Sequence, residues 1–314
     1  MAERAPCPVC TGSTFENVFE VLGNRFERCR ECRFVRMADG MPESSLEDYY
    51  AEARASGEAA WQEHEDNLVK FGRMIERIEA HVVPGRFLDV GCSIGTSLVA
   101  ARDRGWQAIG IELSKPVAEF GRDKWGLDIR DETLEDLATD PAFGSASFDA
   151  IFMHHTLEHV PWPDRILERS FELLRDGGVL FQALPNHGSL KGLAFGKHWS
   201  YGVTFEHVSH FTKKTVVRLI ERIGFTVREV TTPDCRQDPR LVHDLMQRMG
   251  QGKRLGRWIG SPDGQFDLER YVRFITDRKL PNLLSNKLWP ARLATALGRG
   301  QEVYVLAIKP LASA

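Results

Sequence analysis

The chain has 314 residues, of which 42% are hydrophobic, and its formal net charge is −3 at pH 7. This length allows more than one domain and a substantial buried core. The charge argues against a general nucleic-acid-binding protein, which would need a dense basic surface. No apolar run approaches the ~20 residues needed to cross a membrane. The first ten residues lack the apolar core of a signal peptide, and we therefore expect a cytoplasmic protein.

Two Cys-x-x-Cys pairs stand near the N-terminus, and residues 11–28 separate them. Four thiolates at such spacing are typical of a closed, tetrahedral structural Zn²⁺ site. The segment between the pairs alternates in polarity well enough to form a hairpin, so the sequence predicts a zinc-ribbon-like domain over residues 1–40. A redox dithiol or the disulfides of an exported protein would explain two matched pairs less well. The predicted zinc ligands are Cys7, Cys10, Cys29 and Cys32.

Apolar residues recur at helical spacing over residues 68–78, which predicts that residues 41–84 form a helical connector. Pro84 and Gly85 then mark the boundary with the next unit. Tyr49 and Tyr50 are candidates for ligand contact, although core packing is the expected role of both.

Residues 87–112 show the pattern of a nucleotide-binding βαβ unit. An apolar run ends at Gly91, a short turn reaches Gly95, and a helix-like segment follows. A second apolar strand, residues 108–111, leads directly to Glu112. The glycines let the backbone approach a ligand closely. An acid after the second strand suits a ribose diol, because a carboxylate can accept two hydrogen bonds.

Several kinds of site remain compatible with this turn. A dinucleotide site prefers G-x-G-x-x-G, but Ser93 occupies the position of the second glycine. The run from Gly91 to Gly95 also spells the G-x-S-x-G elbow of serine hydrolases. That elbow normally follows several strands and an oxyanion loop, whereas cysteine pairs and polar helices precede this one. An S-adenosylmethionine site is the third possibility, and an ordinary turn without a ligand is the fourth.

The remaining strands of the same unit follow in order. The pattern predicts strands near residues 127–130, 147–153 and 302–309, a further strand that begins near residue 179, and another that begins near residue 225. A helix is expected over residues 165–174, and the glycine pair 177–178 marks the turn into the next strand.

Three motifs give a resemblance to a known family. LDVGCSIG, IGIELS and SFDAIFMHHTLEHVPWP resemble successive motifs of class I S-adenosylmethionine-dependent methyltransferases, in the broad group with ubiquinone-type and sugar-type members. The resemblance covers a predicted core, residues 85–232, and a last strand in residues 301–314. It implies an α/β fold with a Rossmann-like seven-stranded sheet, and helices of the connector lying over the cofactor pocket.

The resemblance also implies cofactor-binding residues. Ser93 departs from the usual DVGCGxG pattern, which is tolerable if that position does not require a positive φ. The implied set comprises Asp89, Gly91 and Gly95, which shape the methionine pocket, Ser93 in the same loop, Glu112, which binds the ribose hydroxyls, its neighbour Leu113, the adenine-side residues Asp131, Thr133 and Leu134, and His154.

The four-cysteine domain ahead of this core is similar to that of sugar C-methyltransferases, which use it to help enclose the substrate. Those enzymes carry a Glu-His pair after the fifth strand, so Glu206 and His207 are the implied catalytic residues, with His207 as the base. Tyr201 and His210 are further candidates. The alternative is that His207 and His210 only orient this loop. The implied acceptor is a small or carrier-linked molecule such as a nucleotide sugar or glycan precursor.

Glu158 and His159 tempt a second catalytic assignment, but their motif occurs in methyltransferases with different acceptors, and a packing role is expected. Together with His155 they have the i, i+3, i+4 spacing of a divalent-ion site, in which a carboxylate would be expected in place of His155.

A basic segment precedes the last strand. Residues 236–299 contain 13 Lys and Arg against six Asp and Glu. We expect residues 233–300 to form a helical insertion that contacts a phosphorylated acceptor, an anionic membrane surface or an acidic partner, unless it is simply a solvated cap. Two other functions stay open: O-methylation of a lipid or natural-product hydroxyl, and a non-catalytic protein that binds a partner through its ribbon and insertion.

Overall fold

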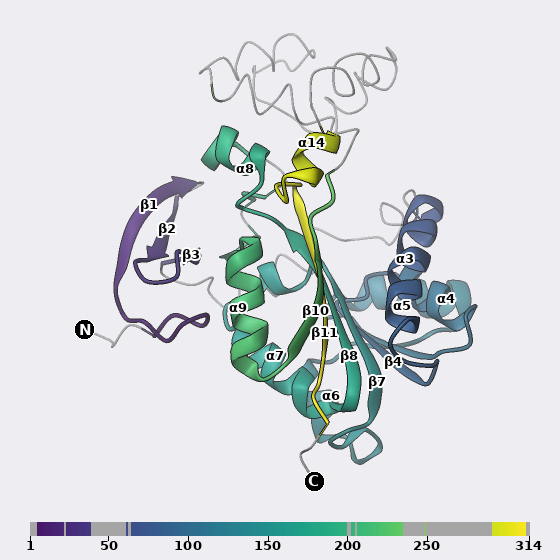
Figure 1. Ribbon diagram of the computed structural model, residues 1–314. Helices are drawn as coiled ribbons and strands as arrows, with labels where there is room; N and C mark the ends of the chain where they lie inside the picture. Colours follow the sequence, from purple (N-terminus) through teal and green to yellow (C-terminus); the bar gives the residue numbers. More distant parts are fainter. Residues whose placement is uncertain are drawn as a thin grey trace, which may run out of the picture.

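The computed structural model contains two β-sheets joined by helices (Figure 1). It describes residues 5–38 except 22, residue 61, residues 64–234 except 200, 201 and 205, residue 248, and residues 291–311. Tyr49, Tyr50, Tyr201 and most of the expected basic insertion lie outside these described residues. At the end of that insertion, α14 (Ala291–Ala296) is helical.

The larger sheet has seven strands and gives the molecule its central layer. Neighbouring strands are parallel, except that β11 runs antiparallel to both of its neighbours, β10 and β8. In spatial order the strands are β10 (Thr226–Thr231), β11 (Glu302–Ile308), β8 (Leu174–Pro185), β7 (Phe148–His154), β4 (Arg86–Val90), β5 (Gln107–Ile111) and β6 (Asp128–Arg130).

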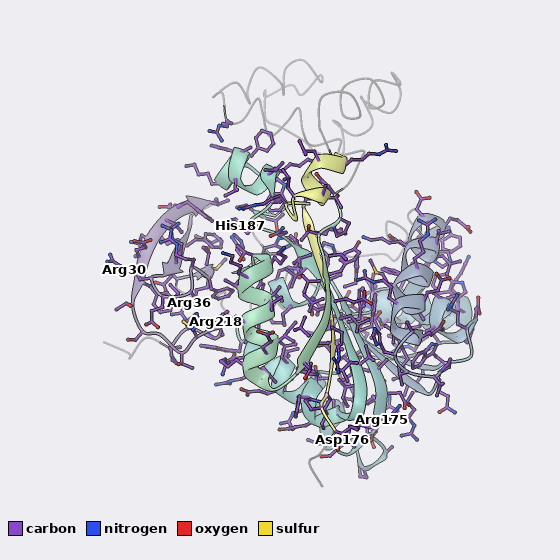
Figure 2. All side chains as sticks on the ribbon, in the orientation of Figure 1. Arg30, Arg36, Arg175, Asp176, His187 and Arg218 are labelled. Atoms are coloured by element: carbon purple, nitrogen blue, oxygen red, sulfur yellow. The ribbon has the colours of Figure 1, made fainter. Side chains whose placement is uncertain are left out.

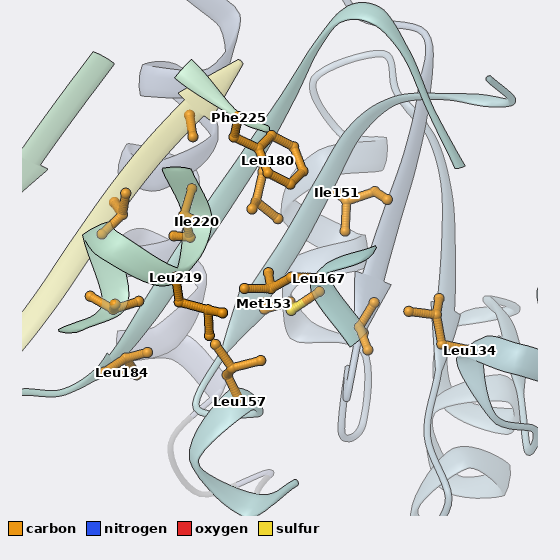
Figure 3. Close-up of a cluster of buried hydrophobic side chains, with 14 of the residues drawn as sticks. Leu134, Ile151, Met153, Leu157, Leu167, Leu180, Leu184, Leu219, Ile220 and Phe225 are labelled. Carbon is orange, nitrogen blue, oxygen red and sulfur yellow. The ribbon is translucent and has the colours of Figure 1, made fainter. Parts of the chain in front are cut away.

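Helices cover both faces of this sheet, so its inner strands read as continuous apolar runs. On β7, Ile151 and Met153 point to one face, and Ala150 and Phe152 point to the other. Figure 3 shows the first face, where Leu219 packs near Met153. The helices whose residues join the first cluster are α6 (Leu134–Thr139), α7 (Pro163–Leu173) and α9 (Lys213–Ile223); those of the second are α3 (His64–Glu79), α4 (Thr96–Arg102) and α5 (Lys115–Trp125).

Local signals explain where α9 begins and ends. Thr212 caps its first turn, since its hydroxyl accepts a hydrogen bond from the backbone N–H of Thr215 at 3.2 Å. Gly224 ends it in the left-handed region, at φ 117°. The helix buries Val216, Leu219 and Ile220 against the sheet.

The smaller sheet has the order β1, β2, β3, β9 and contains the N-terminal hairpin. β1 (Phe15–Val21) and β2 (Asn24–Cys29) pair antiparallel, and β3 (Val35–Met37) follows. The fourth strand, β9 (Ser209–His210), comes from the segment after β8. The hairpin expected between the cysteine pairs is therefore present, but its sheet extends beyond the N-terminal segment.

The predicted α/β fold class is confirmed, because the seven-stranded sheet has the strand order of methyltransferases. The expected second strand is β5, and the expected last strand is β11. Within the described part of the chain, every helix is too short or too polar to cross a membrane.

Candidate active site

The candidate site lies at the carboxyl ends of β4, β5 and β7, where the chain order of the parallel strands reverses. Crevices at such switch points bind ligands in open α/β sheets. The turn from Gly91 to Gly95 follows β4 and leads into α4. His64, the first residue of α3, covers this turn, since its Nδ1 lies 2.9 Å from the hydroxyl oxygen of Thr96. α3 (His64–Glu79) thus contacts the first residue of α4 at the end of this turn.

Both glycines of the turn are required by space and by backbone conformation. Gly91 has φ 79°, and a Cβ there would lie 2.7 Å from the hydroxyl oxygen of Thr156. Gly95 has φ 85°, and a Cβ there would lie 2.5 Å from a methyl carbon of Leu127. Thr156 in turn donates a hydrogen bond to the carbonyl of Val90 at 2.7 Å, which fixes the loop after β7 against the end of β4.

Ser93 adopts φ 53°, a left-handed conformation that L-residues other than glycine visit at a cost of about 1–2 kcal/mol. The condition under which serine was expected to be tolerable here, a position without a positive φ, is therefore not met. A hydrogen bond stabilises this strained conformation, because the Ser93 backbone N–H donates to Glu112 Oε2 at 3.0 Å.

Glu112 ties the two halves of the βαβ unit together. It lies directly after β5 and is buried, with 5% exposure. Its Oε2 accepts from Ser93, and its Oε1 accepts from the backbone N–H of Ser114 at 2.9 Å. Each carboxylate oxygen keeps further lone-pair capacity, so the group can also accept hydrogen bonds from a diol. Leu113 beside it is 56% exposed and is free to cover the face of a ring.

Asp89 on β4 is buried below the turn and accepts a hydrogen bond from the hydroxyl of Ser97. Burial raises the pKa of Asp89 to about 7, while the Ser97 hydrogen bond lowers it and the nearby charge of Glu112 raises it. The group can therefore change its charge near neutral pH.

The three residues expected on the adenine side differ in their exposure and in their contacts. Asp131 is exposed, and its Oδ1 lies 3.4 Å from Nη1 of Arg122. Thr133 caps α6 through a reciprocal pair of hydrogen bonds with Asp136. The side chain of Leu134 packs into the core, at 2% exposure.

His154 ends β7, and its ring contacts Phe71 of α3 edge-on at 5.0 Å. Burial and the charge of His155 hold the pKa of His154 well below its usual range, so this imidazole is neutral. Among the described residues, its Nε2 has no hydrogen-bond partner.

A second group of polar side chains gathers beside the loop after β7. His207 is buried, and its Nδ1 lies 3.2 Å from the carbonyl oxygen of Gly202. Because a carbonyl only accepts, Nδ1 carries the proton and Nε2 keeps its lone pair. The His207 ring meets that of His159 edge-on at 4.8 Å, and His159 Nδ1 lies 3.9 Å from Glu206 Oε2. The predicted pair Glu206 and His207 is thus placed against the loop after β7.

Glu158 also belongs to the cluster around His207 and His159. It lies in a short 3-10 turn, Leu157–His159, and is 2% exposed. One ligand atom from each of Glu158, His159 and His207 lies within 4.8 Å of the others. The spacing grouped His155 with Glu158 and His159. In the structure its Nδ1 lies 3.0 Å from Glu158 Oε1, and its Nε2 lies 3.3 Å from Glu302 Oε1.

The four N-terminal cysteines converge as predicted. Cys7 Sγ is 3.5 Å from Cys32 Sγ, and Cys10 Sγ is 3.5 Å from Cys29 Sγ. All four sulfur atoms lie within 4.8 Å of one another. Thiolates bound at about 2.3 Å to a tetrahedral zinc ion would lie roughly 3.8 Å apart, so the spacing fits that ion.

The two Cys-x-x-Cys segments also have the same local backbone conformation. Thr11 and Arg33, each directly after the second cysteine of its pair, have φ 63° and 70°. The Thr11 N–H donates to the Cys7 carbonyl at 2.8 Å, and the Arg33 N–H donates to the Cys29 carbonyl at 3.0 Å. Hydrogen bonding from Cys32 lowers the pKa of Cys7 to about 5, whereas burial raises the pKa of Cys10 and the hydrogen bond to Cys7 raises the pKa of Cys32.

The ribbon and the segment carrying His207 form one sheet, a relationship that the sequence analysis missed. Val35 pairs with His210, and Arg36 pairs with Ser209. The Ser209 hydroxyl also donates to the Val160 carbonyl at 3.2 Å, which joins β9 to the loop after β7. A two-residue strand has no periodicity from which it could be predicted.

Aromatic rings fill the contact between the two sheets. His210 packs against Phe26 at 4.9 Å, Phe19 at 5.8 Å and His187 at 4.7 Å. Figure 2 shows His187 at the end of the main sheet near the ribbon, with Arg175 at the opposite end. The carboxyl edge of the main sheet therefore faces the ribbon.

The fold and this edge define a Rossmann-like methyltransferase domain. A family model described as "Methyltransferase domain" matches residues 61–230, which is more than half of the chain. The chain therefore belongs to this methyltransferase-domain family, and its fold is that of class I S-adenosylmethionine-dependent methyltransferases.

Individual relatives match a shorter part of the chain than the family model does. A ubiquinone biosynthesis O-methyltransferase from Xanthomonas axonopodis pv. citri is 34% identical over 119 residues, which cover 36% of this chain and 48% of that protein. The match thus spans about half the length of that relative.

Two solved structures share the fold. A SAM-dependent methyltransferase from Archaeoglobus fulgidus aligns with TM-score 0.50 and 18% identity, covering 78% of this chain and 94% of the other. A possible histamine N-methyltransferase from Thermotoga maritima aligns with TM-score 0.51 and 18% identity, covering 84% and 98%.

Proposed function

We propose that the protein is an S-adenosylmethionine-dependent methyltransferase that acts on a small or carrier-linked acceptor, and that His207 is its general base. The observation that carries the proposal is the adjacency of two sites at one sheet edge. The βαβ turn with Glu112 supports cofactor binding, and the cluster around His207 lies beside the loop that follows β7. When bound, the cofactor supplies an electrophilic methyl group.

Each residue has a distinct part in holding the cofactor. Glu112 accepts hydrogen bonds from the ribose hydroxyls, while Gly91 and Gly95 let the backbone approach the methionine portion. Leu113 covers the adenine ring from its exposed position. Asp89 and His154 line the methionine end from β4 and β7.

His207 is suited to removing the acceptor proton. Burial lowers its pKa, and the charge of Glu158 raises it in part, so the imidazole is neutral at physiological pH. Its Nε2 lone pair is available because Nδ1 is committed to Gly202. A positioned base of this kind contributes about 10²–10⁴-fold to a rate. Glu206, 3.9 Å from His159, orients the neighbouring ring.

A structural zinc ion in the four-cysteine cluster is part of the proposal. The ribbon sheet includes β9, which begins two residues after His207, so the metal would stabilise the wall of the acceptor site. This arrangement supports an acceptor enclosed between the ribbon and the main sheet, and we put a nucleotide sugar or glycan precursor first. The 34% identical O-methyltransferase supports a hydroxyl acceptor as the second candidate.

The test is a scan of acceptors with methyl-labelled S-adenosylmethionine, beginning with nucleotide sugars and continuing with phenolic and lipid hydroxyls. We expect transfer to one class, and loss of at least about 100-fold in turnover in His207→Gln with unchanged cofactor affinity. Tight cofactor binding without transfer to any class would favour a non-catalytic, partner-binding protein. Full turnover in His207→Gln would move the base elsewhere.

A further inference from the structure

Beyond the pair Glu206 and His207, a continuous row of ionisable side chains runs through the carboxyl edge of the sheet. It begins on α3, where Lys70 Nζ lies 3.3 Å from Glu302 Oε1. The same oxygen lies 3.3 Å from His155 Nε2, and His155 Nδ1 lies 3.0 Å from Glu158 Oε1. Glu158 then lies against His207. Opposite charges alternate along the row, from the helix over the cofactor turn to the base.

His155 is held as a cation in this row. Burial by itself would lower its pKa, but the two carboxylates, Glu158 and Glu302, raise the pKa of His155 to about 9. Its backbone has φ 56°, an unusual conformation for histidine that directs the ring between the two acids. Tyr304 donates a hydrogen bond to the other oxygen of Glu302, which fixes the outer acid.

Glu158 is consequently an ionised carboxylate in a buried place. Burial would raise its pKa, yet the ion pair with His155, whose Nδ1 lies 3.0 Å from Oε1, lowers the pKa of Glu158. Among the described residues, neither carboxylate oxygen accepts a hydrogen bond of good geometry. An unsatisfied buried carboxylate oxygen is costly unless a cation forms beside it. The imidazolium that His207 becomes on taking a proton is such a cation.

We propose that Glu158 is the positioning residue of the base: it stabilises protonated His207, and the row of His155, Glu302 and Lys70 keeps Glu158 charged. This role rests on the proposed function, in which a proton leaves the acceptor for His207 Nε2. Glu158 does not touch the acceptor and takes no proton itself. The other titratable groups that face His207 are His155, His159, His187, Glu206 and His210.

The decisive measurement is the proton affinity of His207, followed by NMR of labelled histidine in the full-length protein. The His207 resonance is assigned by its absence in His207→Gln. In Glu158→Gln we expect the proton affinity of His207 to fall about 10–100-fold, since a charge within 4.8 Å is removed. Glu158→Asp, which only retracts the charge, should give a smaller fall in the same direction and is the milder change if the amide variant does not fold. Glu168→Gln, an exposed acid on α7, is the matched control and should leave His207 unchanged.

Turnover gives the second readout. Glu158→Gln should lower kcat about 10–100-fold, and it should move the acid limb of the kcat/KM profile to lower pH, with unchanged cofactor affinity. A merely structural role would lower kcat without moving that limb.

An unaltered His207 titration in folded Glu158→Gln or Glu158→Asp would overturn the proposal, as would a second tightly bound metal ion per chain in addition to one zinc. A shifted titration in a protein that transfers no methyl group to any acceptor would reject the proposed function while keeping the coupling of Glu158 to His207.

Discussion

The backbone N–H of Met37 donates to the carbonyl of Val208 at 2.9 Å, so the residue directly after His207 is bonded to the N-terminal ribbon. The neighbouring pairs Val35–His210 and Arg36–Ser209 extend this contact into a ladder. The candidate base is thereby held between two units: the ribbon on one side and the loop after β7 on the other.

We predict that loss of zinc releases β9. Chelation, or Cys29→Ser, should unfold the ribbon, because bound zinc supplies about 10–16 kcal/mol in comparably small domains. Amide hydrogen exchange at Met37, whose N–H donates to the Val208 carbonyl, should then accelerate at least about tenfold, while cofactor affinity stays within about twofold. Adding zinc back to the chelated protein is the control and should restore protection. Unchanged protection at Met37 after complete metal removal would contradict the coupling.

Replacement of Glu112 should weaken cofactor binding. Glu112→Ala removes the acceptor of a ribose diol together with the support of the Ser93 and Ser114 N–H groups, so we expect about a 10–100-fold rise in Kd, equivalent to about 1.5–3 kcal/mol. Isothermal titration calorimetry with S-adenosylmethionine measures this. Glu135→Ala, an exposed acid on α6, should bind like the parent protein. Equal affinities for both variants would remove Glu112 from the site.

Two substitutions in the turn after β4 should change the free energy of unfolding in opposite directions. Ser93→Gly relieves a left-handed conformation, and the free energy of unfolding should rise by up to about 1 kcal/mol. Gly91→Ala introduces strain and a Cβ 2.7 Å from Thr156, so the free energy of unfolding should fall by about 1–3 kcal/mol. Urea denaturation reports both values. A clear loss of stability in Ser93→Gly would show that the serine side chain supports the loop.

Asp89 should make stability depend on pH. Because its pKa is raised to about 7 in the folded protein, the native state holds a proton that the unfolded chain releases near pH 4. The contribution of Asp89 to the free energy of unfolding is therefore greatest at low pH, and it falls as the pH rises from about 4 to 7. Urea denaturation of the ligand-free protein at several pH values should show this slope, and Asp89→Asn should flatten it. An identical slope in both proteins would exclude Asp89 as its origin.

Local patterns sufficed for the elements that are continuous in the chain. The turn from Gly91 to Gly95, the acid Glu112 and the four cysteines all depend on short spacings with a physical reason, and the structure brings each group together as expected. The conformation of Ser93 was not predictable, because a left-handed serine has no signal of its own and exists here through its bond to Glu112.

The row leading to His207 could not be predicted either. Glu302 meets His155 only because β11 inserts beside β8, two strands from β7, at the far end of the chain. Lys70 reaches Glu302 from α3 for the same reason. Such contacts depend on tertiary packing, and no spacing along the chain encodes them.

The order of synthesis gives the shared sheet a further consequence. The ribbon is made first, but the strand that covers the edge of β3 contains Ser209 and His210 and is made only after β8. Until then β3 presents unpaired backbone groups, which is the condition under which edges recruit foreign strands. A nascent or truncated chain that ends before β9 should therefore associate with itself, and the pairing of β9 with β3 is what protects the ribbon.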